Sequence, residues 1–189
     1  MRREFLSLNG VVDHFAVLGI PRAAWVDAEE LKSRFHRLSA ERHPDATGGD
    51  GAAFTELNAA WQALRESAGC LRHFLELEHP DALASAGQTP AELADLFMDI
   101  AAFRQAAQKF GVKYSAATSP LTKAVLEAER VALLTRLAAL AANVEARTEQ
   151  NIATLRSDAT QPSQLATLLA SLVFLTKWTA QLAELRLDL

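Results

Sequence analysis

The chain has 189 residues, 50% of them hydrophobic and 22% charged, and a formal net charge of −4, values that suit a globular protein and argue against nucleic acid as the main partner. No apolar run approaches the roughly eighteen residues that a membrane span needs, and the first residues lack the long apolar core of a secretory signal. The single cysteine, Cys70, excludes an internal disulfide and a Cys-ligated metal site, so a reducing cytoplasm is the expected compartment.

The first predicted helix is short and follows a lead-in at residues 1–12. Asp13 is a suitable N-cap for this helix, which is expected to run from His14 to Leu18. Gly19 stands directly behind the last helical residue, where glycine commonly ends a helix.

Two longer amphipathic helices follow. Asp27 and Glu30 have the spacing of a capping box, which begins a helix over residues 28–42. A second helical pattern occupies residues 52–63. Apolar side chains recur at helical spacing on both, so two antiparallel helices can bury one small core. The two stripes consist of Leu31, Phe35 and Leu38 on the first helix, and of Phe54, Leu57, Trp61 and Leu64 on the second.

The turn between these helices carries Arg42-His43-Pro44-Asp45, followed by a polar, glycine-rich loop at 47–51. Pro44 fixes its own φ and restricts the residue before it, so the turn is stiff. An imidazole and a carboxylate on a stiff turn suit docking better than catalysis. The loop is no phosphate cradle, because the Lys-Ser or Lys-Thr of that motif is missing. The plainer interpretation is a histidine at a helix C-terminus and an Asx-turn residue.

The second half of the sequence predicts a three-helix bundle. A brief apolar segment at 71–77 acts as a linker, and a domain boundary is expected at the small and polar residues that end at Gly87. Three long helical patterns with short links then suggest antiparallel packing, and no strand alternation is present. These helices are expected at residues 89–110, where Gly111 stops the first, at 120–156 and at 163–187. The predicted fold class is all-α.

Some apolar residues of the bundle fall off its core stripes. Met98 points away from the stripe of its helix, and Phe174 and Trp178 lie opposite the leucine stripe of the last helix. Exposed aromatic and Met side chains are enriched in interface cores. They could also be scattered exposed residues, and the aromatic pair could instead pack against the N-terminal domain. The stripe of the first bundle helix consists of Leu93, Leu96, Phe97, Ile100 and Phe103.

A helix that ends in His-Pro-Asp, preceded by Phe15-Ala16-Val17-Leu18-Gly19-Ile20 and followed by a helix with Asn58-Ala59-Ala60-Trp61, resembles a J-domain. An N-terminal J-domain, a linker and a three-helix bundle together resemble the HscB family, co-chaperones of iron–sulfur cluster assembly. Phe97-Met98 lies where that family has a Leu-Met pair. The resemblance covers residues 13–189 and implies three parts: a lead-in at 1–12, a J-domain with a short linker helix at 13–80, and a client-binding bundle at 88–189.

The resemblance implies two docking surfaces and no catalysis, metal or cofactor. A DnaK- or HscA-type chaperone ATPase would be bound by His43, Pro44, Asp45, Lys32, Arg34, Arg37 and Arg42. The iron–sulfur scaffold protein would be bound by Phe97, Met98, Ala101, Phe174 and Trp178. Ala101 is smaller than the family's usual residue, which makes this client surface smaller. No nucleic acid or membrane partner is expected.

Alternatives follow from the charges of the helix at 28–42. Arg34 and Arg37 share a flank with Glu30 and Glu41 at i, i+4 spacing, so this face could be self-paired rather than a docking face. The chain could then be a structural or interaction protein whose J-like domain only packs on the bundle, or a co-chaperone for a different client. A helical enzyme has little support, because no nucleophile–base pair, carboxylate cluster or metal spacing stands out. Cys70 is expected to be an inert thiol.

Overall fold

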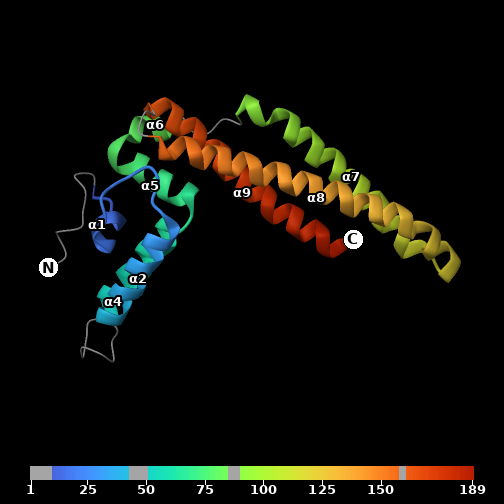
Figure 1. Cartoon of the computed structure of the whole chain (residues 1–189), viewed down its shortest axis with the longest axis horizontal. Coiled ribbons are helices and arrows are strands. Elements are labelled where there is room, and N and C mark those ends of the chain that lie inside the picture. The colour runs from blue at the N-terminus through green and yellow to red at the C-terminus, as the bar shows by residue number, and fades with distance from the viewer. Residues whose placement is uncertain (1–9, 43–50, 85–89, 158–160) are drawn as a thin grey trace. The chain divides into compact units, whose positions relative to one another are not determined.

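A computed structural model describes residues 10–42, 51–84, 90–157 and 161–189. Within these ranges every regular element is a helix and no β-strand forms, which confirms the all-α prediction. The chain divides into two compact units (Figure 1). One comprises residues 1–88 with 152–169, and the other comprises residues 89–151 with 170–189.

The division differs in one respect from the sequence-based domains, which assigned all of 88–189 to the bundle. Residues 152–169 belong to the first unit. There the guanidinium of Arg156 lies over the ring of Trp25, 4.5 Å from its centre. Such a cation–π contact joins residues far apart in the sequence, and no local pattern predicts it.

The first helix of the first unit, α1 (His14–Leu18), forms as predicted. Asp13 caps it, since its Oδ1 accepts the backbone N–H of Ala16 at 3.1 Å. Gly19 ends it with φ of 64°, in the left-handed region that glycine adopts without strain.

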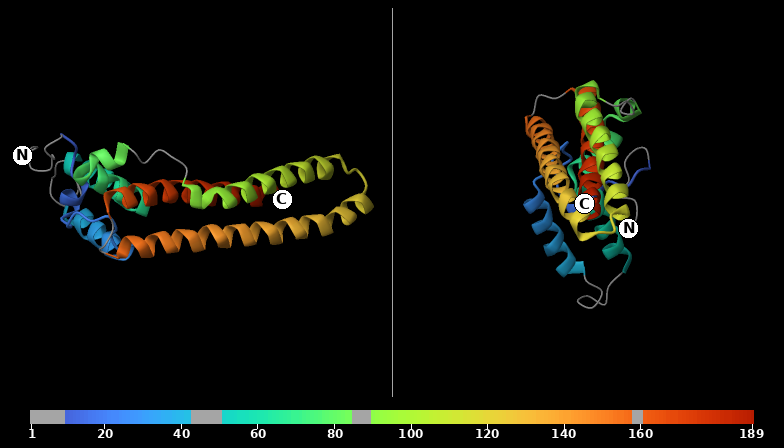
Figure 2. Two further views of the ribbon diagram at one scale, coloured as in Figure 1. Left: turned by 90° about the horizontal axis from the view of Figure 1, so that it is seen from above. Right: turned by 90° about the vertical axis from the view of Figure 1, so that its right-hand side faces the viewer.

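Helices α2 (Ala28–Arg42) and α4 (Gly51–Leu64) form a hairpin against which α1 packs (Figures 1 and 2). The Asp27 half of the predicted capping box is present, since Oδ1 of Asp27 accepts the N–H of Glu29 and of Glu30, both at 3.0 Å. The helices share one apolar core, in which Phe35, Leu38 and Trp61 are half-buried at the edge. The buried members are Phe15, Val17, Leu18, Leu31, Leu57, Ala60, Leu64 and Cys70.

The predicted linker is a regular helix that contributes to the first core. This helix, α5 (Ser67–Glu78), buries Cys70, Leu71, His73 and Leu75, and a short α6 (Pro80–Ala84) follows it. Its first turn lies so close to the end of α4 that a Cβ at Gly69 would stand 2.4 Å from the carbonyl oxygen of Ala63. Glycine is therefore required at that close approach.

The second unit consists of a 3₁₀ turn (Ala91–Leu93), α7 (Ala94–Ala116), and most of α8 (Pro120–Arg156) and α9 (Pro162–Asp188), which run alongside one another (Figure 2). The predicted ends of α8 and α9 are confirmed to within two residues. The prediction that Gly111 stops α7 was wrong. A glycine inside a helix costs only about 1 kcal/mol relative to alanine. Burial of Phe110 and its stacking on Tyr114, with ring centres 5.6 Å apart, outweigh that cost.

One buried polar contact fixes α9 to the 3₁₀ turn that precedes α7. The Oγ of Ser171, which is fully buried, donates to Oε1 of Glu92 at 2.8 Å. The side chain of Glu92 thus reaches across the bundle to α9. The surrounding core consists of Leu93, Leu96, Ile100, Phe103, Ala107, Phe110, Leu133, Leu137, Leu140, Val144, Leu175, Trp178 and Leu182.

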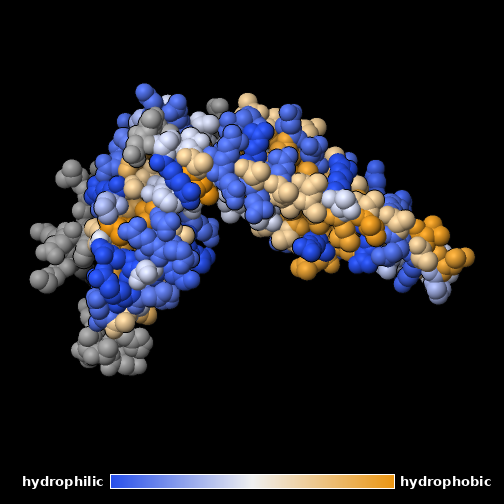
Figure 3. Space-filling model, viewed as in Figure 1, coloured by the Kyte–Doolittle hydropathy of each residue, from blue (hydrophilic) through white to orange (hydrophobic). Residues whose placement is uncertain are grey.

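By length and composition alone, α9 is long and apolar enough to cross a membrane. It has 27 residues, and its most apolar 18-residue window has a mean hydropathy of 1.3. Half of that window is buried inside the protein, as expected of a core helix in a bundle. Figure 3 shows that apolar surface also extends along the exposed side of the bundle unit.

Candidate functional site

The α2–α4 hairpin holds its two helices together through large side chains. Leu31 and Leu57 are buried between the helices, and the rings of Phe35 and Trp61 stack with centres 4.9 Å apart. This packing supports Trp61 as a core residue, as predicted. The predicted docking residues His43, Pro44 and Asp45 belong to residues 43–50, which lie outside the described residues.

The basic residues of α2 are not equivalent. Lys32 and Arg37 are exposed, and Arg42 is half-buried. Arg34 instead turns toward α1, where its Nε donates to the carbonyl of Leu18 at 3.2 Å and its Nη2 donates to the carbonyl of Gly19. A cation at a helix C-terminus satisfies carbonyls that have no partner within the helix. The guanidinium of Arg34 is therefore engaged within the J-like unit.

The two ion pairs predicted along α2 do not form in the described part of the chain. Arg34 is held at α1, so it does not meet Glu30, and Arg37 makes no ion pair with Glu41. Exposed i, i+4 pairs contribute only a few tenths of a kcal/mol, which is too little to compete with the bonds to α1. The interpretation of this face as self-paired loses its premise.

A polar cluster that includes the buried Asp13 and His73 ties α1 to α5, and sequence reasoning missed it. Asp13 is buried and accepts from Nε of Arg22 at 2.8 Å, while the same guanidinium reaches Oε1 of Glu78 at 2.6 Å. The hydrogen bonds to Glu78 and then to Asp13 raise the pKa of Arg22. The sequence identified Asp13 only as a cap. Arg22 links it to Glu78 of α5, which is 65 residues further along the chain, and such a bridge leaves no periodic signal.

Two histidines complete this cluster. Nε2 of the buried His73 accepts the backbone N–H of His14 at 3.0 Å, and its Nδ1 lies 3.2 Å from Oε2 of Glu76. With Nε2 accepting, the ring proton is placed on Nδ1, facing Glu76. Burial, and next the neighbouring His73, lower the pKa of His14. These contacts are structural, because no nucleophile stands beside them and no group of three metal-binding side chains occurs in the described residues.

Cys70 has the properties of an inert thiol, as predicted. It is buried in the first core, and its Sγ lies 3.6 Å from the carbonyl oxygen of Ala23. Burial raises the pKa of Cys70 to about 12, so the thiolate that reacts and binds metals is not populated at neutral pH.

The predicted client surface of the bundle is partly formed, with two corrections. Met98 is 65% exposed, as its off-stripe position predicted. Phe97, placed on the core stripe, is 49% exposed, so that placement was wrong. Trp178, predicted to be exposed, is only 3% exposed and belongs to the bundle core, so that prediction was also wrong. Ala101 and Phe174 are half-buried.

The two corrections have one physical cause. The ring of Trp178 lies 6.4 Å from that of Phe97 and 5.9 Å from that of Phe174. Because α9 packs on two neighbouring helices, its buried arc is wider than a single stripe and takes in Trp178. Phe97 then covers this ring from the α7 side and remains half outside. The exposed apolar surface here is therefore carried by α7, at Phe97 and Met98.

Comparison with known proteins identifies one part of the first unit. The DnaJ domain family matches residues 13–69, which therefore form a J-domain. The chain is 40% identical to the "Chaperone protein DnaJ" of Campylobacter hominis over 55 residues, which make up 28% of this chain and 15% of that protein. The protein of the same name from Trichormus variabilis is 33% identical over 92 residues, 47% of this chain and 23% of that protein.

The similarity is thus confined to a small part of these relatives. The DnaJ protein of Thermosynechococcus vestitus is 41% identical over 56 residues, 29% of this chain and 14% of its own length. The chain spans less than a quarter of each of the three relatives. No solved structure matches the chain.

Proposed function

We propose that this chain is a J-domain co-chaperone that stimulates ATP hydrolysis by a DnaK- or HscA-type chaperone and brings to it a client held by the helical bundle. The observation that carries the proposal is the DnaJ domain match over residues 13–69, which spans α1, α2 and α4. His43, Pro44 and Asp45 stand in the sequence between the two helices of the hairpin. On this proposal the chain itself catalyses no reaction.

The chaperone contact on this proposal combines the His-Pro-Asp segment with the cations of α2 that form no ion pair among the described residues. Lys32 and Arg37 are exposed, and Arg42 ends the helix next to the turn. These positive charges suit an acidic chaperone surface, because complementary charge speeds and orients docking. Arg34 is left out of this contact, since its guanidinium is bonded to the end of α1.

Steady-state ATP turnover of the chaperone, measured with and without this chain, tests the proposal. Stimulation should be lost with His43→Gln and reduced with Arg37→Ala. Lys109→Ala serves as the control, since it removes an exposed cation from the bundle instead. If His43→Gln stimulates as well as the parent chain, the hairpin-turn mechanism is wrong.

The finer proposal concerns the client: from the resemblance to the HscB family, we propose that it is an iron–sulfur scaffold protein. Phe97 and Met98 supply adjacent exposed apolar side chains where that family has its Leu-Met pair. Half-buried Ala101 and Phe174 flank them, with Trp178 packed behind. Two weak contacts on one body can raise avidity by about 10²–10⁴, so client and chaperone need not bind tightly on their own.

A binding titration against the scaffold protein tests this surface. Phe97→Ala combined with Met98→Ala should weaken binding by about tenfold or more, since both side chains are truncated where they are exposed. Leu121→Ala combined with Val125→Ala is the matched control, because these are exposed apolar residues elsewhere on the bundle unit. Unchanged binding by the first pair would place the client site elsewhere.

A co-chaperone for a different client is the second candidate. It is favoured by the comparisons, since the relatives named above are DnaJ chaperones and the family match ends at residue 69. Ala101, where a larger apolar residue is usual, also reduces the client surface. Two results together would favour this candidate over the scaffold client: the chain stimulates the ATPase in a way that depends on His43, and it does not bind the scaffold protein at high micromolar concentration.

A further inference from the structure

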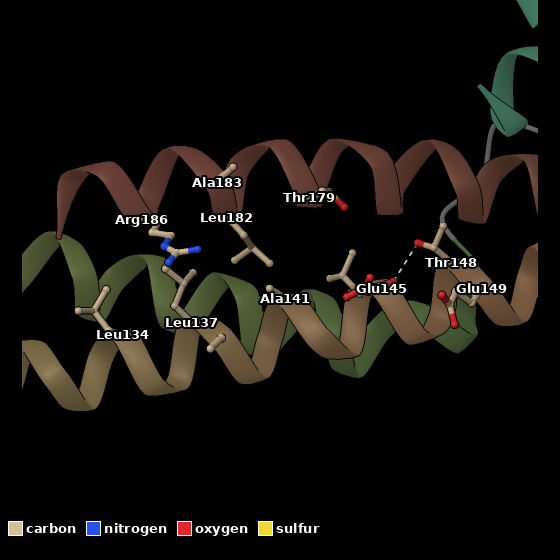
Figure 4. Close-up of a pocket in the computed structure, with 12 residues that line it drawn as sticks. Leu134, Leu137, Ala141, Glu145, Thr148, Glu149, Thr179, Leu182, Ala183 and Arg186 are labelled. Atoms are coloured by element: carbon tan, nitrogen blue, oxygen red, sulfur yellow. Dashed lines mark hydrogen bonds between the residues drawn. The ribbon is translucent and has the colours of Figure 1, made fainter. Parts of the chain in front are cut away.

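The second unit has a groove where α8 and α9 meet, and none of the residues of the two surfaces proposed above lines it (Figure 4). Its volume is about 790 Å³. It extends from Leu134 to Glu149 along α8 and from Thr179 to Arg186 along α9. The buried side chains of Leu137, Val144 and Leu182 form its floor.

Three alanines lie along the borders of the groove. Ala138 and Ala141 of α8 and Ala183 of α9 are exposed, and each presents only a methyl group. The separation of packed helices depends on the side chains at the contact, so alanine lets another helix approach closely. A groove of this kind between two antiparallel helices is where further helices of a bundle pack.

The charges of the groove are divided between its ends. Glu145 and Glu149 lie at one end, and Arg186 lies at the other, beside Leu134 (Figure 4). All three charged side chains are exposed, and none forms an ion pair within the described part of the chain. A groove that is acidic at one end and basic at the other is complementary to a copy of itself turned end for end.

We propose that this groove is the contact surface of a homodimer, in which α8 and α9 of two copies pack as four antiparallel helices about a two-fold axis near Ala141. In this arrangement Arg186 of each copy faces Glu145 and Glu149 of the other, so the same ion pairs form twice. The two Ala141 methyl groups meet at the axis, where a larger side chain would hold the copies apart.

The size of the groove limits the surface that this dimer can bury. From Leu134 to Glu149 it runs about 22 Å at about 1.5 Å per residue, and two helices are about 20 Å across. The contact thus covers on the order of 450 Å² per copy, roughly half of the ~800 Å² of a standard interface. The dimer is accordingly weak and forms in the micromolar range or above.

Sedimentation velocity of the full chain, from a few micromolar to about a millimolar, tests the proposal through charge reversal. The parent should show a monomer–dimer equilibrium. Arg186→Glu should raise the Kd by about tenfold or more, which corresponds to about 1.4 kcal/mol. Glu145→Lys combined with Glu149→Lys should do the same. An equal mixture of these two proteins should form a heterodimer, because every contact again joins opposite charges.

Matched controls carry the same charge changes outside the groove. Arg147→Glu on α8 and Glu184→Lys on α9 are exposed positions that do not line it, and both should dimerise like the parent. A disulfide test avoids charge altogether. Ala141→Cys should cross-link two copies on mild oxidation, whereas Ala139→Cys, on another exposed face of α8, should not.

Three results would overturn the proposal. The parent chain could remain monomeric at about a millimolar, the two charge-reversed proteins could fail to associate when mixed, or Ala139→Cys could cross-link as readily as Ala141→Cys. A parent that stays monomeric while the helix of another protein binds the groove would count against the homodimer in the same way.

Discussion

We predict that Arg34 stabilises the J-domain and does not dock a chaperone, and the variant Arg34→Ala tests this prediction. Arg34→Ala removes two hydrogen bonds to the carbonyls of Leu18 and Gly19. Bonds from a charged donor contribute about 1.5–3 kcal/mol, and a cation at a helix C-terminus about 0.3–1 kcal/mol. Because Arg34 is half-buried and both bonds depend on α1 staying in place, the terms are not additive. We expect α1 to lose about 1–2 kcal/mol of its stability against local opening.

Hydrogen exchange followed by mass spectrometry measures this loss segment by segment. A change of 1–2 kcal/mol should speed exchange in peptides from α1 by about fivefold to thirtyfold and leave peptides from α7 unchanged. Arg37→Ala is the matched control, since Arg37 is exposed, and its effect should stay within about 0.5 kcal/mol. Exchange in α1 that is the same in Arg34→Ala as in the parent would refute the assignment of Arg34 to the helix end.

Three further predictions concern stability and reactivity. Burial and the neighbouring His73 lower the pKa of His14, so the unfolded state binds the proton more readily and the first unit loses stability as pH falls below about 6.5. Urea midpoints of the parent should therefore fall between about pH 7.5 and pH 5, and less steeply for His14→Gln. Cys70, with its pKa raised to about 12, should resist a thiol reagent at about pH 8 until urea unfolds the chain. Leu175→Ala, at a fully buried position, should cost about 2–5 kcal/mol in urea unfolding, whereas Leu187→Ala, at an 87% exposed one, should change it by less than about 0.5 kcal/mol.

Local chemistry made the J-domain half predictable. Asp13, Gly19 and Asp27 act on backbone groups within a few residues of themselves, so their effects can be predicted from the neighbouring sequence alone. The contacts that could not be predicted join distant segments. Arg34 bonds to carbonyls 15 and 16 residues away, and His73 accepts the N–H of a residue 59 positions earlier. No propensity or periodicity encodes such pairs.

The bundle half shows a different limit, because periodicity identifies one buried stripe but a bundle helix faces two neighbours. Trp178 fell outside the stripe and is nevertheless buried, whereas Phe97 fell on a stripe and is half exposed. The burial of Trp178 and the exposure of Phe97 change which residues are available for the proposed client contact. A tryptophan packed in the core cannot reach a partner without unfolding its surroundings, so α9 contributes to that contact mainly by supporting Phe97. If the proposed client contact forms, it depends on α7. The small side chain of Ala101 on that helix then affects the choice of client more than the residues of α9 do.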